Sequence, residues 1–210
     1  MLLIFDWDGT LCDSTGRIVK AMQDAAAKLG FGALEDHEIL EIIGLSLPAA
    51  IQRIYPELSE SDCKQLREEY SVQYLERDRV PSAFFPQVQD TLDELRAQGH
   101  ILTVATGKSR RGLDRVMAGM DLLDYFDGSR CADETASKPH PKMVFELLDV
   151  FDTGPEDAIV VGDTEFDMEM ALNAKVPRVG VSYGAHSADR LHKYDLKACL
   201  DNFDELLKHL

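Results

Sequence analysis

The stretch Leu2-Leu3-Ile4-Phe5-Asp6-Trp7-Asp8-Gly9-Thr10 decides the fold. Its apolar start is too short for a helix and has the length of a strand that is buried on both faces. Packing gives no reason for such a strand to end in two aspartates. Because side chains alternate along a strand, we expect Asp6 and Asp8 on one side and Trp7 on the other. The stretch therefore predicts a buried strand that brings two carboxylates to its carboxyl end.

The bulk composition limits the class of protein. The 210 residues suffice for one core and a small accessory domain. The 38 acidic residues outnumber the 22 basic ones, and a net charge of −16 argues against a nucleic-acid partner. The four widely spaced cysteines predict neither disulfides nor a zinc site. Without the features of a signal peptide or a membrane span, a cytoplasmic protein with no membrane partner is expected.

Residues 15–83 carry only helical periodicity. Apolar stripes predict four helices there, and no strand is expected between residues 15 and 80. The turn-rich residues 12–16 and the segment Pro81–Pro86 punctuate the chain on either side. Glycines are expected to end the first two helices, and a proline and a serine to begin the other two: Gly30, Gly44, Pro48 and Ser59.

The remaining chain alternates between helical and strand patterns. Strands are predicted at residues 101–105, 128–132, 158–161 and 176–181, with helices between them and a closing helix up to Leu210. Such alternation is typical of a parallel sheet covered by helices on both faces. The predicted fold is therefore α/β, with a Rossmann-like core of residues 1–14 and 84–210. Residues 15–83 are predicted to form an all-α cap domain inserted after the first strand.

Polar residues follow the predicted strands at the edge where open α/β sheets bind ligands. They are Asp6 and Asp8 after the first strand, Thr106-Gly107-Lys108 after the second, Lys138 after the third, and Asp163 and Asp167 after the fourth. Two carboxylates about 4 Å apart repel by roughly 4 kcal/mol at an effective dielectric constant near 20. Three acids in one pocket would therefore bind a proton or a cation, and oxygen ligands at this density suit Mg²⁺.

A metal held by acids attracts an oxyanion. Thr106 and the backbone N–H of Gly107 can donate hydrogen bonds to phosphoryl oxygens, and Lys138 can neutralise further charge. Each residue also has a structural reading. Thr106 can bond locally, Lys138 can be a solvated lysine, and Asp163 or Thr164 can cap the following helix. Together, the residues favour a phosphate site.

These motifs resemble those of phosphatases of the haloacid dehalogenase superfamily. The chain shows D-x-D-G-T from Asp6 to Thr10, a threonine at Thr106, Lys138 followed by proline, and G-D-T-x-x-D from Gly162 to Asp167. The helical insert resembles the small cap of the phosphoglycolate-phosphatase-like branch. The resemblance implies Mg²⁺-dependent hydrolysis of a small phosphate monoester, a phosphorylated metabolite, through an aspartyl-phosphate.

The resemblance also implies roles for single residues. Asp6 corresponds to the nucleophile and Asp8 to the general acid and base. Mg²⁺ would be held by Asp6, the backbone carbonyl of Asp8 and Asp163, with Asp167 supporting them. Thr106 and Lys138 would hold the phosphoryl group, and Lys138 would keep Asp6 ionised. Further substrate contacts are expected from Gly107, Lys108, Arg17 near the hinge, and Gly44 and Leu45 in the cap turn.

Two positions depart from the pattern of the family that the chain resembles. Trp7 replaces the commoner Phe or Leu, and Gly107 stands where many relatives have Asn.

Three alternative functions stay open. A phosphosugar mutase would need a cap cation, for which Arg53 is a candidate. A dehalogenase needs neither acid nor metal, so the presence of Asp8 and Asp163 argues against it. A phosphate-binding scaffold is the non-enzymatic alternative. The identity of the ester and the oligomeric state stay open.

Overall fold

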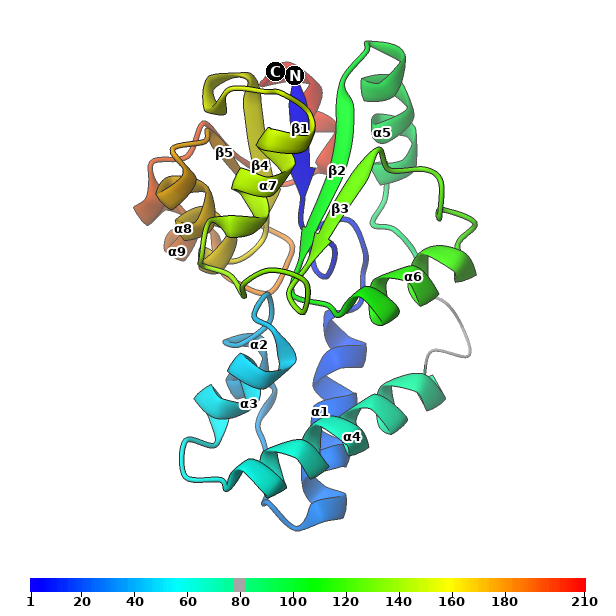
Figure 1. The fold of residues 1–210 in the computed structure, drawn as a ribbon, viewed down its shortest axis with the longest axis vertical. Helices are drawn as coiled ribbons and strands as arrows, with labels where there is room; N and C mark the ends of the chain where they lie inside the picture. The colour runs from blue at the N-terminus through cyan, green and yellow to red at the C-terminus, as the bar shows by residue number, and fades with distance from the viewer. Residues whose placement is uncertain (78–81) are drawn as a thin grey trace.

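The structure is a computed structural model that describes residues 1–77 and 82–210. A six-stranded sheet occupies one end of the molecule, and four helices, α1–α4, occupy the other (Figure 1). The strand order is β3-β2-β1-β4-β5-β6, and every pair of neighbouring strands is parallel. The strands are β1 (Leu2–Phe5), β2 (Ile101–Thr106), β3 (Gly128–Cys131), β4 (Ala158–Gly162), β5 (Arg178–Val181) and β6 (Ala198–Leu200).

Strand β1 lies in the middle of this sheet. It pairs with β2 on one side and with β4 on the other, so that Phe5 is opposite Val104 and Val161. Leu3 and Phe5 belong to one buried cluster, whereas Leu2 and Ile4 belong to another. Both faces of β1 are therefore packed, and its carboxyl end faces the helices α1–α4 (Figure 1). The predicted α/β class with a parallel sheet is confirmed.

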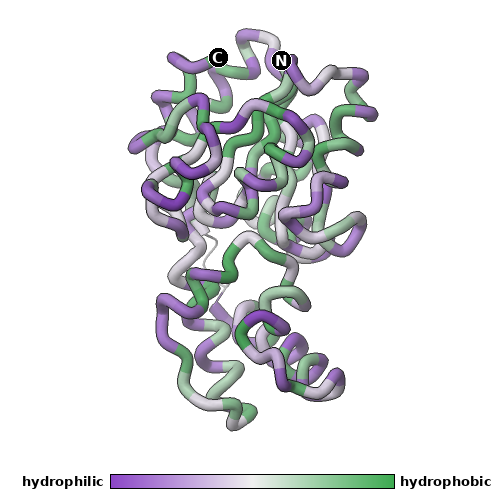
Figure 2. Tube along the Cα trace, turned by 90° about the vertical axis from the view of Figure 1, so that its left-hand side faces the viewer, coloured by the Kyte–Doolittle hydropathy of each residue, from purple (hydrophilic) through white to green (hydrophobic). Residues whose placement is uncertain are grey.

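Helices cover both faces of the sheet. The face of Phe5 packs against α5 (Val88–Ala97), α6 (Arg110–Gly119) and the 3-10 segment Phe203–Lys208. The opposite face packs against α7 (Lys142–Val150) and α8 (Glu165–Ala174). In a view turned by 90°, hydrophobic segments lie inside this end of the molecule (Figure 2). The remaining short elements are α9 (Ala188–Leu191) and the 3-10 segments Pro155–Asp157 and His192–Tyr194.

Trp7 lies on the side away from the acid site. It is 1% exposed, and its ring centroid lies 5.8 Å from that of Phe84 and 6.0 Å from that of Phe126. The expectation that Trp7 serves packing is therefore confirmed.

Two details near the C-terminus differ from the sequence-based prediction. Strand β6 and helix α9 were not predicted, because three or four residues are too few to show a clear periodicity. The closing segment is a 3-10 helix that ends at Lys208 rather than a helix that reaches Leu210. None of these three elements contains a residue of the predicted site.

Helices α1 (Thr15–Leu29), α2 (Asp36–Leu40), α3 (Leu47–Ile54) and α4 (Glu60–Arg77) form a separate buried cluster. Gly30 ends α1 in the left-handed conformation. The Ser46 hydroxyl accepts a hydrogen bond from the Ala49 N–H and caps α3. Ser59 accepts one from the Asp62 N–H at the start of α4, as predicted. The second helix is shorter than predicted, since it ends at Leu40 and a turn leads to Gly44.

The described part of this segment contains no strand. Residues 78–80 of the predicted helical stretch, and Pro81 of the second linker, lie outside the described residues. Among the described helices, none combines the length and the apolar character needed to cross a membrane.

Candidate active site

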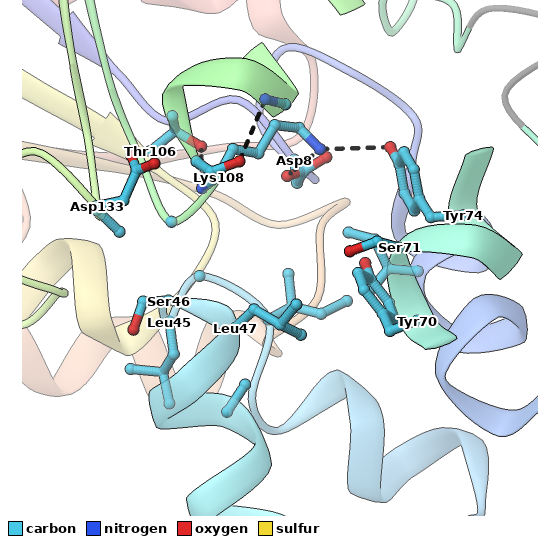
Figure 3. Close-up of a pocket in the computed structure, with 18 of the residues that line it drawn as sticks. Asp8, Leu45, Ser46, Leu47, Tyr70, Ser71, Tyr74, Thr106, Lys108 and Asp133 are labelled. Atoms are coloured by element: carbon cyan, nitrogen blue, oxygen red, sulfur yellow. Dashed lines mark hydrogen bonds and ion pairs between the residues drawn. The ribbon is translucent and has the colours of Figure 1, made fainter. Parts of the chain in front are cut away.

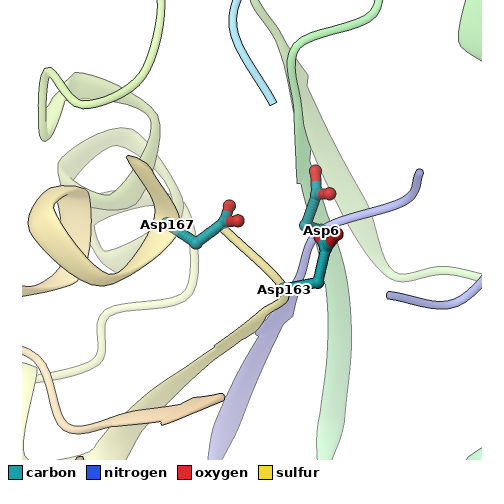
Figure 4. Close-up of side chains that lie close together, drawn as sticks. All are labelled: Asp6, Asp163 and Asp167. Atoms are coloured by element: carbon teal, nitrogen blue, oxygen red, sulfur yellow. The ribbon is translucent and has the colours of Figure 1, made fainter. Parts of the chain in front are cut away.

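Three carboxylates meet where β1 and β4 end. Asp6 follows β1 directly, Asp163 follows β4, and Asp167 lies in the first turn of α8. One oxygen of each carboxylate lies within 4.8 Å of the others (Figure 4). None of the three residues is more than 2% exposed. The parallel sheet thus brings Asp6 together with two acids that lie about 160 residues later in the sequence.

Neighbouring hydroxyl and amide groups orient two of these acids. The Thr10 hydroxyl donates to Asp163 Oδ1 at 2.9 Å, and the Ala185 N–H donates to Oδ2 at 2.7 Å. Asp167 Oδ2 accepts from the hydroxyl of Thr164 at 2.6 Å and from its N–H at 3.1 Å. Thr164 and Asp167 form the capping box of α8. The prediction that Thr164 caps the following helix is therefore confirmed, and its partner in the capping box, Asp167, also belongs to the acid cluster.

The turn after Asp8 requires glycine. Gly9 has a φ of +85°, and a β-carbon built on it would lie 2.2 Å from Asp163 Oδ2. A side chain at this position would displace the carboxylate. Gly9 therefore allows the backbone to approach the acid cluster closely.

Lys138 lies between two of the acids rather than in solvent. It is 1% exposed, its Nζ forms an ion pair with Asp6 Oδ1, and it lies 2.6 Å from Asp167 Oδ1. Burial alone lowers the pKa of Lys138, but Asp167 and Asp6 outweigh that effect and raise it above its usual value. Lys138 is therefore charged and supplies the positive partner of the cluster.

Burial dominates the electrostatics of the acids. It raises the pKa of Asp6 well above the usual value, although Lys138 acts in the opposite direction. Burial, followed by repulsion from Asp167, raises the pKa of Asp163 to about 7. The single lysine therefore offsets only part of the cost of holding these carboxylates together.

The donor set fits a divalent cation. Asp6 Oδ2 is buried and has no hydrogen-bond partner among residues 1–77 and 82–210. The three carboxylates of the cluster offer oxygen ligands, which hard cations such as Mg²⁺ prefer. Asp6, Asp163 and Asp167 could thus hold Mg²⁺, whose charge would relieve their repulsion.

The side chain of Asp8 lines the same cavity as Asp6 but has different partners. Its carboxylate lies outside the cluster, in which Asp167 takes the third position. Asp8 Oδ1 accepts from the Ser14 hydroxyl at 2.5 Å, and Oδ2 forms an ion pair with Lys108 Nζ at 2.9 Å. The chain turns after Trp7, as the hydrogen bonds from the N–H groups of Leu11 and Cys12 to the Trp7 carbonyl show. Asp8 therefore lies in a turn rather than in the strand that precedes Asp6.

A cavity of about 360 Å³ opens between the strand ends and the helices α1–α4 (Figure 3). Lys108 Nζ at its rim also donates to the hydroxyl of Tyr74 in α4, at 3.3 Å. The Thr106 hydroxyl accepts from the Lys108 N–H at 3.2 Å. The predicted residues that line the cavity are Asp6, Asp8, Gly44, Leu45, Thr106, Gly107 and Lys108.

Four predicted residues do not line this cavity. Three of them belong to the buried cluster around the Asp6 carboxylate instead. They are Asp163, Asp167 and Lys138. Arg17 is not among the residues that line the cavity, and its expected substrate contact stays a prediction. Successive side chains on a helix differ in direction by about 100°. This places Ile18, rather than Arg17, on the face of α1 that lines the cavity.

The cap turn packs tightly against the sheet end. A β-carbon built on Gly44, whose φ is +98°, would lie 2.8 Å from the Thr164 hydroxyl. The Ser46 N–H donates to the Ser137 hydroxyl at 2.8 Å. The turn therefore touches loops that follow two different strands.

Comparison with known proteins agrees with this geometry. Residues 3–181 match the family model described as "Haloacid dehalogenase-like hydrolase". The chain belongs to this family. The predicted class of enzyme, a hydrolase, is thereby confirmed.

Named relatives of this hydrolase cover nearly its whole length. It is 32% identical to "Probable phosphatase IndB" of Dickeya dadantii (strain 3937), over 98% of this chain and 91% of the relative. It is 28% identical to "Phosphoglycolate phosphatase" of Vibrio vulnificus (strain CMCP6), over 98% and 94%. The crystal structure of "a predicted phosphoglycolate phosphatase" from Haemophilus somnus 129pt superposes with a TM-score of 0.89 at 25% identity, over 99% and 96%.

Sequence reasoning about this hydrolase assigned no role to three residues of the site. Thr10 lies inside the first motif, so its position near the acids could be predicted from sequence. Its hydrogen bond to Asp163 could not. Ser14 shows no signal beyond a hydroxyl six residues after Asp8. Tyr74 was placed in the buried stripe of its helix, but its contact with Lys108 joins residues 34 positions apart.

Proposed function

We propose that this hydrolase is a Mg²⁺-dependent phosphatase that cleaves a small phosphate monoester through an aspartyl-phosphate intermediate. The observation that carries the proposal is the placement of Asp6 and Asp8. Asp6 is buried beside Lys138, and both acids line one cavity while their carboxylates have different partners. Two acids in such different surroundings can take different chemical roles.

The first step transfers the phosphoryl group to the enzyme. A carboxylate oxygen of Asp6 attacks phosphorus while the bond from phosphorus to the ester oxygen breaks. The protonated carboxyl of Asp8 gives its proton to the leaving oxygen, which departs as an alcohol. Lys108 and Ser14, which contact the two oxygens of Asp8, hold this side chain in the cavity.

The second step releases phosphate. The Asp8 carboxylate takes a proton from a water molecule, and the water oxygen attacks phosphorus. The bond between phosphorus and the Asp6 oxygen breaks, which restores the Asp6 carboxylate and returns Asp8 to its protonated form. Thr106 and the Gly107 N–H donate to phosphoryl oxygens in both steps.

Lys138 keeps the nucleophile ionised. Burial favours the neutral form of Asp6, which could not attack phosphorus, and the ion pair with Lys138 opposes that tendency. Lys138 also neutralises charge on the phosphoryl group. Its contact with Asp167 fixes its position.

Asp6, the backbone carbonyl of Asp8 and Asp163 are the proposed ligands of Mg²⁺, and Asp167 supports them. Bound there, the ion would neutralise negative charge on the carboxylates and on the phosphoryl oxygens. The unpartnered oxygen of Asp6 and the raised pKa of Asp163 support this assignment.

We further propose that residues 1–14 and 84–210 form the catalytic core and that residues 15–83 form a cap domain. The two linkers would act as hinges, and closure would exclude bulk water during phosphoryl transfer. The contacts of Lys108 with Tyr74 and of Ser46 with Ser137 support a closed arrangement. The four free cysteines support a reducing, cytoplasmic setting.

The mutase alternative is less well supported. Arg53, its candidate cation, lies 5.2 Å from the centre of the Phe166 ring and is not among the residues that line the cavity. A second phosphate would therefore find no positive charge there from Arg53. Since Asp8 and Asp163 are both present in the site, the dehalogenase alternative gains no support either.

The test is phosphate release from a broad panel of phosphate monoesters with Mg²⁺ and with EDTA. Release that requires Mg²⁺, together with a phosphorylated Asp6 peptide after acid quenching, is the expected result. Isomerised sugar phosphate without free phosphate would favour a mutase, and halide release without metal would favour a dehalogenase. No reaction with any ester would favour a binding protein.

A further inference from the structure

The cavity has two chemically different walls. The wall at the strand ends carries Asp6, Asp8 and Thr106, where the phosphoryl group is proposed to bind. The opposite wall comes from α1, α3, α4 and the turn before α3. Figure 3 shows Leu45, Leu47 and Tyr70 across the cavity from Asp8 and Thr106.

The cap wall carries no charge. Among residues 15–77, those that line the cavity include no Asp, Glu, Lys, Arg or His. They are mostly aliphatic or aromatic, for example Ile18, Met22, Ile42, Leu47, Pro48 and Tyr70. A substrate held at the strand ends would direct its leaving group toward this wall.

Among the described residues, three cations line the cavity, and all of them come from the segment that follows β2: Lys108, Arg111 and Arg115. Lys108 is paired with Asp8, and Arg115 lies 5.9 Å from the centre of the Tyr74 ring. Arg111 is exposed. A carboxylate or second phosphate that packs against Leu47 and Tyr70 would thus face an apolar surface that carries no charged side chain of its own, which is unfavourable for an ion.

We propose that the physiological leaving group is an uncharged, largely apolar alcohol, whose ring or branched chain packs against Leu47 and Tyr70. This inference rests on the proposed phosphatase function and narrows its substrate class. The enzyme then discriminates against esters, such as phosphoglycolate, whose leaving group is an anion.

A matched pair of esters tests the proposal on the Mg²⁺-loaded enzyme. Benzyl phosphate and 4-carboxybenzyl phosphate have the same reacting group and differ in one carboxylate. We expect kcat/KM for benzyl phosphate to be higher by about tenfold or more, the scale on which apolar pockets discriminate. Benzylphosphonate should inhibit competitively at lower concentration than 4-carboxybenzylphosphonate, which tests binding apart from chemistry.

A cap variant adds a second, independent readout. Leu47→Lys places a cation on the apolar wall and should lower the preference for benzyl phosphate by about tenfold or reverse it. Gln52→Lys, on an exposed position of the same helix outside the cavity, should leave the preference unchanged.

The outcomes separate the two proposals. Equal or faster hydrolysis of 4-carboxybenzyl phosphate, or of phosphoglycolate, would overturn the apolar leaving group and leave the phosphatase function intact. Absence of phosphate release from every ester in the panel would overturn both. A preference for benzyl phosphate that Leu47→Lys weakens and Gln52→Lys preserves would support the inference.

Discussion

Gly107 lies directly against the carbonyl group of Leu45. A β-carbon built on Gly107 would lie 2.5 Å from the Leu45 oxygen and 2.7 Å from the Gly44 oxygen. Both obstacles are backbone atoms, so no side-chain rotation could relieve the overlap. Gly107 therefore lets the turn at Gly44 and Leu45 approach the end of β2 closely.

Gly107→Ala should hold the cap turn away from the strand end. Because misplacing reacting groups by about 1 Å can cost about 10²-fold, we expect kcat/KM to fall by up to that factor. Steady-state kinetics on the best ester of the panel measures the effect. Gly16→Ala is the control, since its β-carbon meets no atom within 4 Å. Equal kinetics for the wild type and Gly107→Ala would show that this contact is irrelevant to turnover.

Asp6→Asn should remove the nucleophile and leave the shape of the side chain nearly unchanged. Loss of a catalytic nucleophile typically costs far more than a thousandfold, so we expect kcat to fall by at least about 10³-fold. Circular dichroism should show an intact fold. Asp13→Asn changes an exposed acid of the same segment and should keep full activity. Residual activity near that of the wild type would rule out an Asp6 phosphoenzyme.

Lys138→Met should leave Asp6 and Asp167 buried without their positive partner. Removing one member of a buried ion pair costs about 3–5 kcal/mol of unfolding free energy. Chemical denaturation in EDTA measures this loss. Lys142→Met is the control, because its side chain is 51% exposed and its 3.7 Å pair with Glu146 belongs to a class worth about 0–1 kcal/mol. Similar losses in the two variants would contradict a central role for Lys138.

The stability of the metal-free protein should depend on pH through Asp163. Burial and Asp167 raise its pKa from 3.8 to about 7, so folding favours the protonated form. The contribution of Asp163 to the free energy of unfolding should be complete below about pH 4 and lost as the pH rises through about 7. Thermal unfolding in EDTA across this range provides the measurement.

Mg²⁺ should reverse that trend. The ion requires the ionised carboxylate, so its stabilising effect should be larger at pH 8 than at pH 6. The rise in Tm on adding Mg²⁺ at the two pH values is the readout. Asp163→Asn should abolish most of the difference between the two pH values in the rise in Tm that Mg²⁺ causes. A Tm that Mg²⁺ leaves unchanged at both pH values would argue against a metal site here.

The sheet could be predicted from sequence because its strands leave strong local signals. The first strand is an uninterrupted apolar run, and motif residues directly follow β1 and β4 and end β2. The parallel topology then brings Asp6 and Asp163 together without further information. Strand β6 left no such signal, because three residues at a sheet edge are compatible with several conformations.

The side-chain geometry of the site was less accessible to sequence reasoning. Strand alternation alone grouped Asp8 with Asp6, but the turn that begins at Trp7 sends the two carboxylates to different partners. The stripe with Tyr70 and Tyr74 looks the same in sequence whether it faces other helices or a cavity. Only the structure shows that both tyrosines line the cavity and that Tyr74 contacts Lys108.

The central position of β1 has a consequence for biosynthesis. The ribosome makes this strand before its two neighbours in the sheet, which are residues 101–106 and 158–162. The first neighbour is made about halfway through the 210 residues and the second after about three quarters, so a nascent chain carries this apolar strand without its full set of partners until then. The helices between residues 15 and 77 have their own buried cluster and can collapse earlier. Asp6 is thus made about 160 residues before Asp163 and Asp167, the acids that complete its surroundings.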